Sequence, residues 1–139
     1  MDVINSFASG VLIVDDEPDI NMTVTTVLEE NGFQVDSFTD PLLALENFRK
    51  QAGLYDLIIF DIKMPYMNGF ESYRQIKKID DKVKICFLTA GEIYDGAYTD
   101  MSNTLDKRYY IQKPIENEEL IARLNKIIMT YDNNKFKSK

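Results

Sequence analysis

The stretch Val11-Leu12-Ile13-Val14-Asp15-Asp16 decides the fold class, because four consecutive apolar residues run directly into two carboxylates. An apolar run without alternation is typical of a strand that is buried on both faces of a parallel sheet. A second run of this kind, residues 57–60 (LIIF), leads into Asp61. We therefore expect two central strands that each carry acidic groups to the same edge of a sheet.

Three further apolar runs complete a regular alternation of strands and helices. Residues 33–38 (FQVDSF) mix polar and apolar side chains and are predicted to form an edge strand, and the other two runs lie at 83–88 and 109–112. With right-handed crossovers, this alternation predicts an α/β fold: a doubly wound sheet of five parallel strands in the order 2-1-3-4-5. Helices are predicted between and after the strands from apolar groups at helical spacing: Ile20, Val24, Val27 and Leu28; Leu42, Leu45 and Phe48; Phe70, Tyr73, Ile76 and Ile79; Ile93, Ala97, Met101 and Leu105; Leu120, Leu124, Ile127 and Tyr131.

Local signals mark two helix ends. Asp40 followed by Pro41 is typical of an N-cap and a first helical residue. Asn31-Gly32 is typical of a helix stop. We expect one domain over residues 10–131, after a short lead at 1–9, and a flexible tail at 132–139, where the apolar stripe ends.

Composition excludes several classes of protein. The chain has 139 residues, no histidine and a net charge of −7, so serine–histidine triads and histidine metal sites are excluded. The negative charge argues against direct binding of nucleic acid or an anionic membrane. The single cysteine, Cys86, lies in an apolar run and is expected to be buried and inert. A single cysteine without a disulfide partner fits a reducing, cytoplasmic compartment. No apolar stretch approaches the ~20 residues of a membrane span.

The residues that follow the predicted strands carry the chemistry. The first strand leads into Asp15 and Asp16, the third into Asp61, the fourth into Thr89 and the fifth into Lys113. The carboxyl ends of parallel strands meet at one edge of the sheet, where ligands of open α/β folds bind. Three carboxylates, a hydroxyl and an ammonium are therefore expected to converge there.

Such a group of side chains suits a divalent cation and a phosphoryl group. Carboxylates without histidine or cysteine favour Mg²⁺, which also relieves their mutual repulsion. Lys113, Thr89 and backbone N–H groups around Ala90 can bind phosphoryl oxygens. A carboxylate can itself be the nucleophile, and Asp61 is the best candidate because it stands alone at the end of a central strand.

Four stretches together resemble the receiver domain of two-component response regulators: VLIVDDEP (11–18), LIIFDIKMPYMNGFE (57–71), CFLTA (86–90) and IQKPI (111–115). The resemblance covers about residues 10–130, with the parts in family order on the expected elements. It implies a flavodoxin-like (βα)5 fold and a signalling switch that catalyses its own phosphorylation and dephosphorylation.

The resemblance also implies a role for each matching position. Asp61 accepts a phosphoryl group from a phosphohistidine of a sensor kinase or phosphotransfer protein, or from a small acyl phosphate. The bond between Lys113 and Pro114 is expected to be cis. The other implied roles are Mg²⁺ binding by Asp16, by Asp15 mainly through water, by Asp61 and by the carbonyl of Lys63; phosphoryl binding by Thr89, Ala90 (backbone) and Lys113; and an aromatic switch at Tyr110 coupled to Thr89.

Output is expected on one surface, formed by the helix near 93–105, the fifth strand and the last helix. A downstream protein partner is predicted to bind there, with a weak or phosphorylation-dependent homodimer left open. Its candidate anchors are Tyr94, Tyr98, Tyr109 and Arg123.

Several alternatives remain at this point. The sequence is equally consistent with Tyr110 as a packing residue. A pseudo-receiver would use the same fold as a protein-interaction module without accepting phosphate. An aspartyl-phosphate phosphatase of the haloacid dehalogenase kind would need a DxD pair at its first strand. A flavodoxin would need a phosphate loop where this chain has acidic residues.

Overall fold

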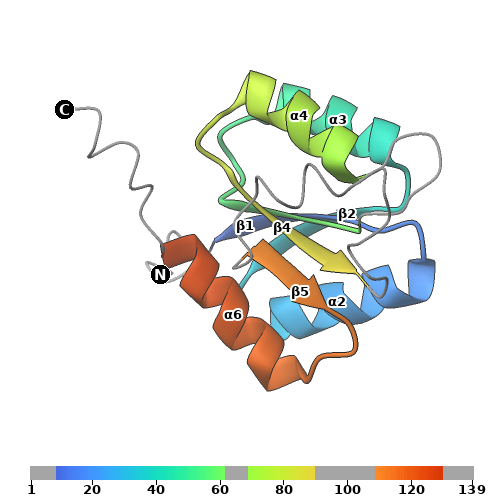
Figure 1. Ribbon diagram of the computed structural model, residues 1–139, viewed down its shortest axis with the longest axis vertical. Helices are drawn as coiled ribbons and strands as arrows, with labels where there is room; N and C mark the ends of the chain where they lie inside the picture. Colours follow the sequence, from blue (N-terminus) through green and yellow to red (C-terminus); the bar gives the residue numbers. More distant parts are fainter. Residues whose placement is uncertain (1–8, 62–68, 90–108, 130–139) are drawn as a thin grey trace, which may run out of the picture.

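The computed structural model of the chain describes residues 9–61, 69–89 and 109–129 (Figure 1). Within them, five parallel strands form one sheet in the order β2-β1-β3-β4-β5, which confirms the predicted topology. The strands are β1 (Gly10–Val14), β2 (Gln34–Phe38), β3 (Leu57–Phe60), β4 (Lys84–Thr89) and β5 (Tyr110–Gln112). The helices are α2 (Pro18–Glu30), α3 (Pro41–Lys50), α4 (Gly69–Ile79) and α6 (Asn117–Met129).

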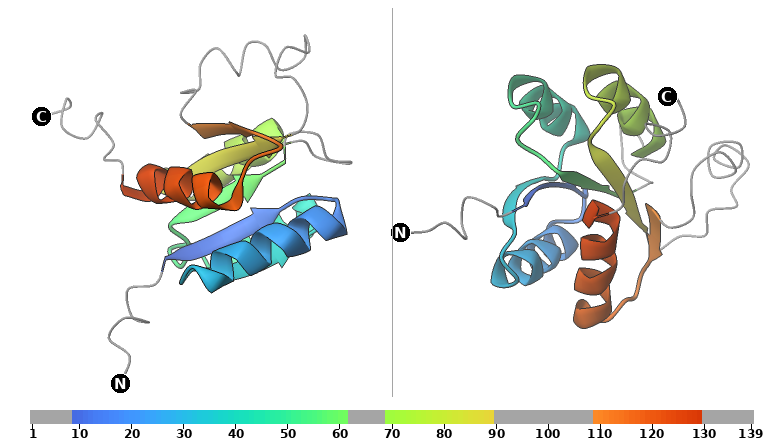
Figure 2. Two further views of the ribbon diagram at one scale, coloured as in Figure 1. Left: turned by 90° about the horizontal axis from the view of Figure 1, so that it is seen from below. Right: turned by 90° about the vertical axis from the view of Figure 1, so that its left-hand side faces the viewer.

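The helices cover both faces of the sheet, as the two turned views in Figure 2 make clear. Helices α3 and α4 pack on one face and α2 and α6 on the other. Along each strand, successive side chains enter opposite cores, so that Leu12 and Val14 face α3 and α4 while Val11 and Ile13 face α2 and α6. Burial on both faces explains why β1 and β3 are apolar throughout.

The local signals are also confirmed. Strand β2 is an edge strand with mostly exposed side chains. The Asp40 carboxylate accepts a hydrogen bond from the Leu42 N–H at 2.9 Å, so it caps α3 as predicted. Helix α2 ends at Glu30, and Gly32 follows with a φ of +90°, a conformation that glycine adopts without strain.

Some expectations fall on other parts of the chain. The helix predicted near 93–105, the lead at 1–8 and the tail at 132–139 lie outside the described residues. Among the helices that the structure describes, none is long and apolar enough to span a bilayer.

Candidate functional site: an acidic cluster at the carboxyl edge

The central strands place two aspartates side by side at the carboxyl edge of the sheet. Asp15 directly follows β1 and Asp61 directly follows β3. The Asp61 N–H donates to the Val14 carbonyl at 3.0 Å, and the Asp15 N–H donates to the Phe38 carbonyl at 3.1 Å. Backbone hydrogen bonds to neighbouring strands therefore continue one residue beyond each strand and hold the two carboxylates in register.

Asp16 joins these two residues in a compact acidic cluster. Asp15, Asp16 and Asp61 each offer a carboxylate oxygen, and the three oxygens lie within 4.8 Å of one another. Asp15 and Asp61 are buried and Asp16 is half-buried. Like charges this close, screened little by water, raise each other's energy, so the arrangement favours a cation between them.

Among the described residues, Lys113 places a positive charge against the cluster. Its Nζ lies 3.2 Å from Oδ2 of Asp15, and both side chains are largely buried. The other oxygen of Asp15 accepts a hydrogen bond from the Glu17 N–H at 3.0 Å. The bond between Lys113 and Pro114 is cis, as expected.

One residue that supports the cluster was missed at the level of sequence. Asn21 on α2 is buried, and its Nδ2 donates to the carbonyls of Phe38 (2.8 Å) and Asp15 (3.3 Å). The amide therefore ties α2 to the chain just after β1 and at the end of β2. Its position three residues before Val24, on the apolar stripe, was the signal in the sequence.

The remaining predicted site residues are described only in part. Thr89 is the last residue of β4, and its backbone pairs with Gln112 of β5. Lys63 and Ala90 lie outside the described residues. Tyr110 is buried, with its ring stacked on Phe87 at a centroid distance of 5.4 Å. Burial raises the pKa of Tyr110 to about 12, so the ring stays neutral at physiological pH.

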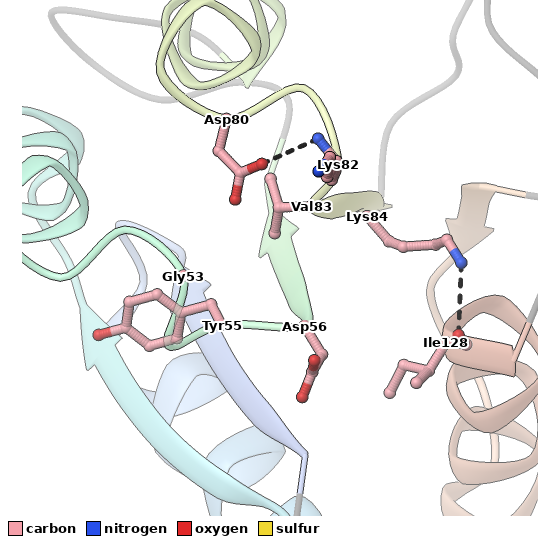
Figure 3. A pocket seen from close by; sticks show the side chains of 8 residues that line it. All are labelled: Gly53, Tyr55, Asp56, Asp80, Lys82, Val83, Lys84 and Ile128. Carbon is pink, nitrogen blue, oxygen red and sulfur yellow. Dashed lines mark hydrogen bonds between the residues drawn. The ribbon is translucent and has the colours of Figure 1, made fainter. Parts of the chain in front are cut away.

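A cavity of about 330 Å³ lies at the opposite, amino end of the sheet (Figure 3). Its polar groups are engaged locally: Asp56 accepts from the Gly10 N–H at 3.1 Å, Asp80 accepts from the Lys82 N–H at 2.9 Å, and Lys84 Nζ donates to the Ile128 carbonyl at 3.3 Å. These contacts stabilise turns and the end of a helix. The carboxylates of this cavity each accept from a backbone N–H, whereas those at the carboxyl edge crowd against one another.

An acidic cluster beside a lysine, at the carboxyl edge of a parallel sheet, is typical of sites for a divalent cation and a phosphoryl group. Comparison with known proteins identifies the family to which this protein belongs. Residues 11–125 match the response regulator receiver domain, and the chain belongs to that family. It is a receiver domain of two-component signal transduction.

Individual relatives agree with this assignment. The chain is 33% identical over 121 residues to the transcriptional regulatory protein CpxR homolog of Haemophilus influenzae, covering 86% of this chain and 50% of that protein. It is 34% identical over 117 residues to the transcriptional regulatory protein DltR of Streptococcus agalactiae, covering 82% and 49%. The chain thus spans about half the length of these curated relatives.

A solved structure agrees as well. The receiver domain protein of Clostridium thermocellum superposes with a TM-score of 0.75 at 27% identity, covering 94% of this chain and 99% of that one.

Proposed function

We propose that Asp61 accepts a phosphoryl group from the phosphohistidine of a sensor kinase or phosphotransfer protein, or from a small acyl phosphate. A carboxylate oxygen of Asp61 forms the new bond to phosphorus while the donor's bond to phosphorus breaks. In an acyl phosphate this is the phosphorus–oxygen bond, and the carboxylate leaves; in a phosphohistidine it is the phosphorus–nitrogen bond. The imidazole leaves and takes up a proton, and the product on this chain is an aspartyl phosphate. This switch works in the cytoplasm, within a domain over residues 10–131.

The acidic cluster is the observation that carries this proposal. Asp61 follows a central strand, stands within 4.8 Å of Asp15 and Asp16, and has neighbours that are themselves held by backbone contacts. The cluster lies at the carboxyl edge of the sheet, which is the edge where ligands of open α/β folds bind. Phosphoryl transfer needs such positioned charges more than covalent machinery.

The donor set fits Mg²⁺. Three carboxylates contribute only oxygen ligands, which Mg²⁺ prefers, and their crowding is relieved by a divalent cation. We assign Asp16 and Asp61 as direct ligands, Asp15 as a ligand mainly through water, and the carbonyl of Lys63 as the remaining protein ligand. When bound, the ion would offset the negative charge of the incoming phosphoryl group.

Lys113 is assigned to the phosphoryl oxygens, together with the Thr89 hydroxyl and the backbone N–H of Ala90. Its ammonium already lies 3.2 Å from Asp15 within the same cluster, so the charge is present before any phosphoryl group arrives. Transfer of this ammonium from Asp15 to the phosphoryl group would exchange one charge-assisted contact for another.

Output is assigned to the surface of β5, α6 and the segment 93–105, where a downstream protein partner would bind. Tyr110 on β5 is the proposed switch, moving with Thr89 when Asp61 is phosphorylated. Direct binding of DNA or of a membrane is not part of this function, because the chain is acidic. A weak or phosphorylation-dependent homodimer is compatible with it.

The test is phosphorylation by a small acyl phosphate with Mg²⁺, followed by intact mass. We expect one phosphoryl group on the wild type, none on Asp61→Asn, and a normal adduct on Asp56→Asn, a matched change at the amino end of the same strand. An adduct that persists in Asp61→Asn, or none on the wild type, would contradict the assignment.

A further inference from the structure

A row of three aromatic rings lies directly beneath the acidic cluster. Phe60, Phe87 and Tyr110 occupy paired register positions on β3, β4 and β5. Phe60 stacks on Phe87 at 6.4 Å and Phe87 stacks on Tyr110 at 5.4 Å between ring centroids. Because Asp61 is the next residue after Phe60, the row leads from the acidic cluster to the far edge of the sheet.

The row lies in one core, and α6 lies in the other. The three rings face α3 and α4, whereas Leu120, Leu124 and Ile127 of α6 pack against the opposite face of the sheet. Among the residues that the structure describes, the two cores lie on opposite faces of the sheet, so a connection from the rings to α6 passes through the sheet backbone.

Arg123 of α6 makes such a connection. Its Nη2 donates to the backbone carbonyl of Tyr110 at 2.9 Å, so the helix holds the same residue whose ring ends the aromatic row. The guanidinium also lies close enough to the buried Cys86 thiol to oppose the rise in its pKa to about 12 that burial causes. Arg123 thus reaches into the contact between helix and sheet, although α6 exposes many of its polar residues.

We infer that Arg123 is a positioning residue that couples the state of Asp61 to the position of α6, through Tyr110 and the aromatic row. The inference rests on the proposed function, because it assigns the route by which phosphorylation reaches the output surface. A shift of the Tyr110 ring moves its backbone carbonyl, and the hydrogen bond passes that displacement to Arg123. The coupling is reciprocal, so a partner that moves α6 also changes the phosphorylation equilibrium at Asp61.

Lys84 offers a matched control. Its Nζ, on β4, donates to the Ile128 carbonyl near the end of α6 at 3.3 Å, so it also fastens α6 to the sheet with a cation. Lys84 faces the amino end of the sheet and belongs to no part of the row. Loss of Lys84 loosens α6 without breaking the contact to Tyr110.

The experiment uses NMR of the full chain with and without beryllofluoride and Mg²⁺, a mimic of the phosphoryl group. Val14 methyls report the acidic cluster, the Tyr110 ring reports the row, and Leu124 and Ile127 methyls report α6. We expect all three to shift in the wild type and in Lys84→Met. In Arg123→Met, Val14 should respond normally while the α6 response falls by about half or more, and Arg123→Lys should restore part of it.

The outcomes separate the inference from the function on which it rests. If Arg123→Met keeps the full α6 response, or if Lys84→Met loses as much, Arg123 has no positioning role. Should Arg123→Met fail to fold, Arg123→Lys decides, because an α6 response fully equal to that of the wild type contradicts a role for the guanidinium. A wild type that takes up no phosphoryl group by mass overturns the proposed function first, and this inference with it.

Discussion

The two ends of the sheet use the same residue types for opposite purposes. At the amino end, Asp56 and Asp80 each accept a backbone N–H, and Lys84 donates to a helix carbonyl. At the carboxyl end, three carboxylates crowd within 4.8 Å, with Lys113 beside one of them. The first arrangement satisfies each polar group with its neighbours, whereas the second concentrates like charge.

This difference shows how to tell a structural acid from a functional one. Accepting from a nearby backbone N–H does not by itself distinguish them, because Asp15 does so as well as Asp56 and Asp80. The difference is that Asp15 lies in a crowded group of three carboxylates. A cluster of carboxylates opposes folding until a cation or a proton joins it, so its presence indicates a binding function rather than a structural one. The cavity at the amino end is therefore no guide to the chemistry of this protein.

The largest effect on stability is expected at the amino end, from Gly10→Ala. A Cβ at this position would lie 2.3 Å from the backbone carbonyl oxygen of Leu54, so β1 or the turn that precedes β3 must shift. We expect the free energy of unfolding to fall by about 3 kcal/mol, measured by urea denaturation. Gly53→Ala is the control: its φ of +96° is strained but the space is open, so a loss of about 1 kcal/mol is expected.

The second largest effect on stability is expected at the carboxyl end, from the binding of Mg²⁺ to the acidic cluster. Mg²⁺ at a hundred times its dissociation constant should raise the free energy of unfolding by about 2.7 kcal/mol, visible as a higher Tm. Asp16→Asn should lose most of this increase and be slightly more stable than the wild type without Mg²⁺, because one repulsive charge is gone. Asp80→Asn, at the other end, should keep the full increase; equal stabilisation of all three proteins would place the ion elsewhere.

Alkaline pH should lower the free energy of unfolding, because a buried tyrosine lies near each end of the sheet. Burial raises the pKa of Tyr55, at the amino end, and of Tyr110, in the aromatic row, from 10 to about 12. Between these values the unfolded chain releases protons that the folded protein retains, so stability is intact below pH 10 and falls as pH rises toward 12.

The loss should be on the order of 1 kcal/mol for each tyrosine. Denaturation at pH 9 and pH 11 measures it, and Tyr55→Phe or Tyr110→Phe should each remove a share. A pH dependence that neither substitution reduces would contradict the assignment.

The smallest effect is expected from Asp56→Asn. The asparagine side-chain oxygen can still accept from the Gly10 N–H, so the free energy of unfolding should change by no more than about 0.5 kcal/mol. A loss of several kcal/mol, or loss of the Mg²⁺ response, would mean that the amino end is not merely structural. Thermal melts with and without Mg²⁺ check both points.

Much of the fold was predictable because local patterns and topology agree. The apolar strands at 11–14 and 57–60 indicated burial on both faces, and the mixed strand at 33–38 indicated an edge. These patterns favoured central positions for the first and third strands, which the order 2-1-3-4-5 satisfies. Each end of a predicted strand lies within one residue of its place in the structure. Strand ends shift in this way because a single hydrogen bond decides whether a terminal residue is assigned to the strand.

The sequence by itself also determined that Asp15, Asp16, Asp61 and Lys113 meet at one edge, since each follows a parallel strand or its neighbour. Only the tertiary structure decided which groups pair there: Lys113 with Asp15, and Asn21 with one carbonyl just after β1 and one at the end of β2. It also turned Arg123, a predicted surface anchor, toward the Tyr110 carbonyl. Periodicity fixes the face on which a side chain lies, but its partner depends on distances between segments far apart in the chain, which only packing sets.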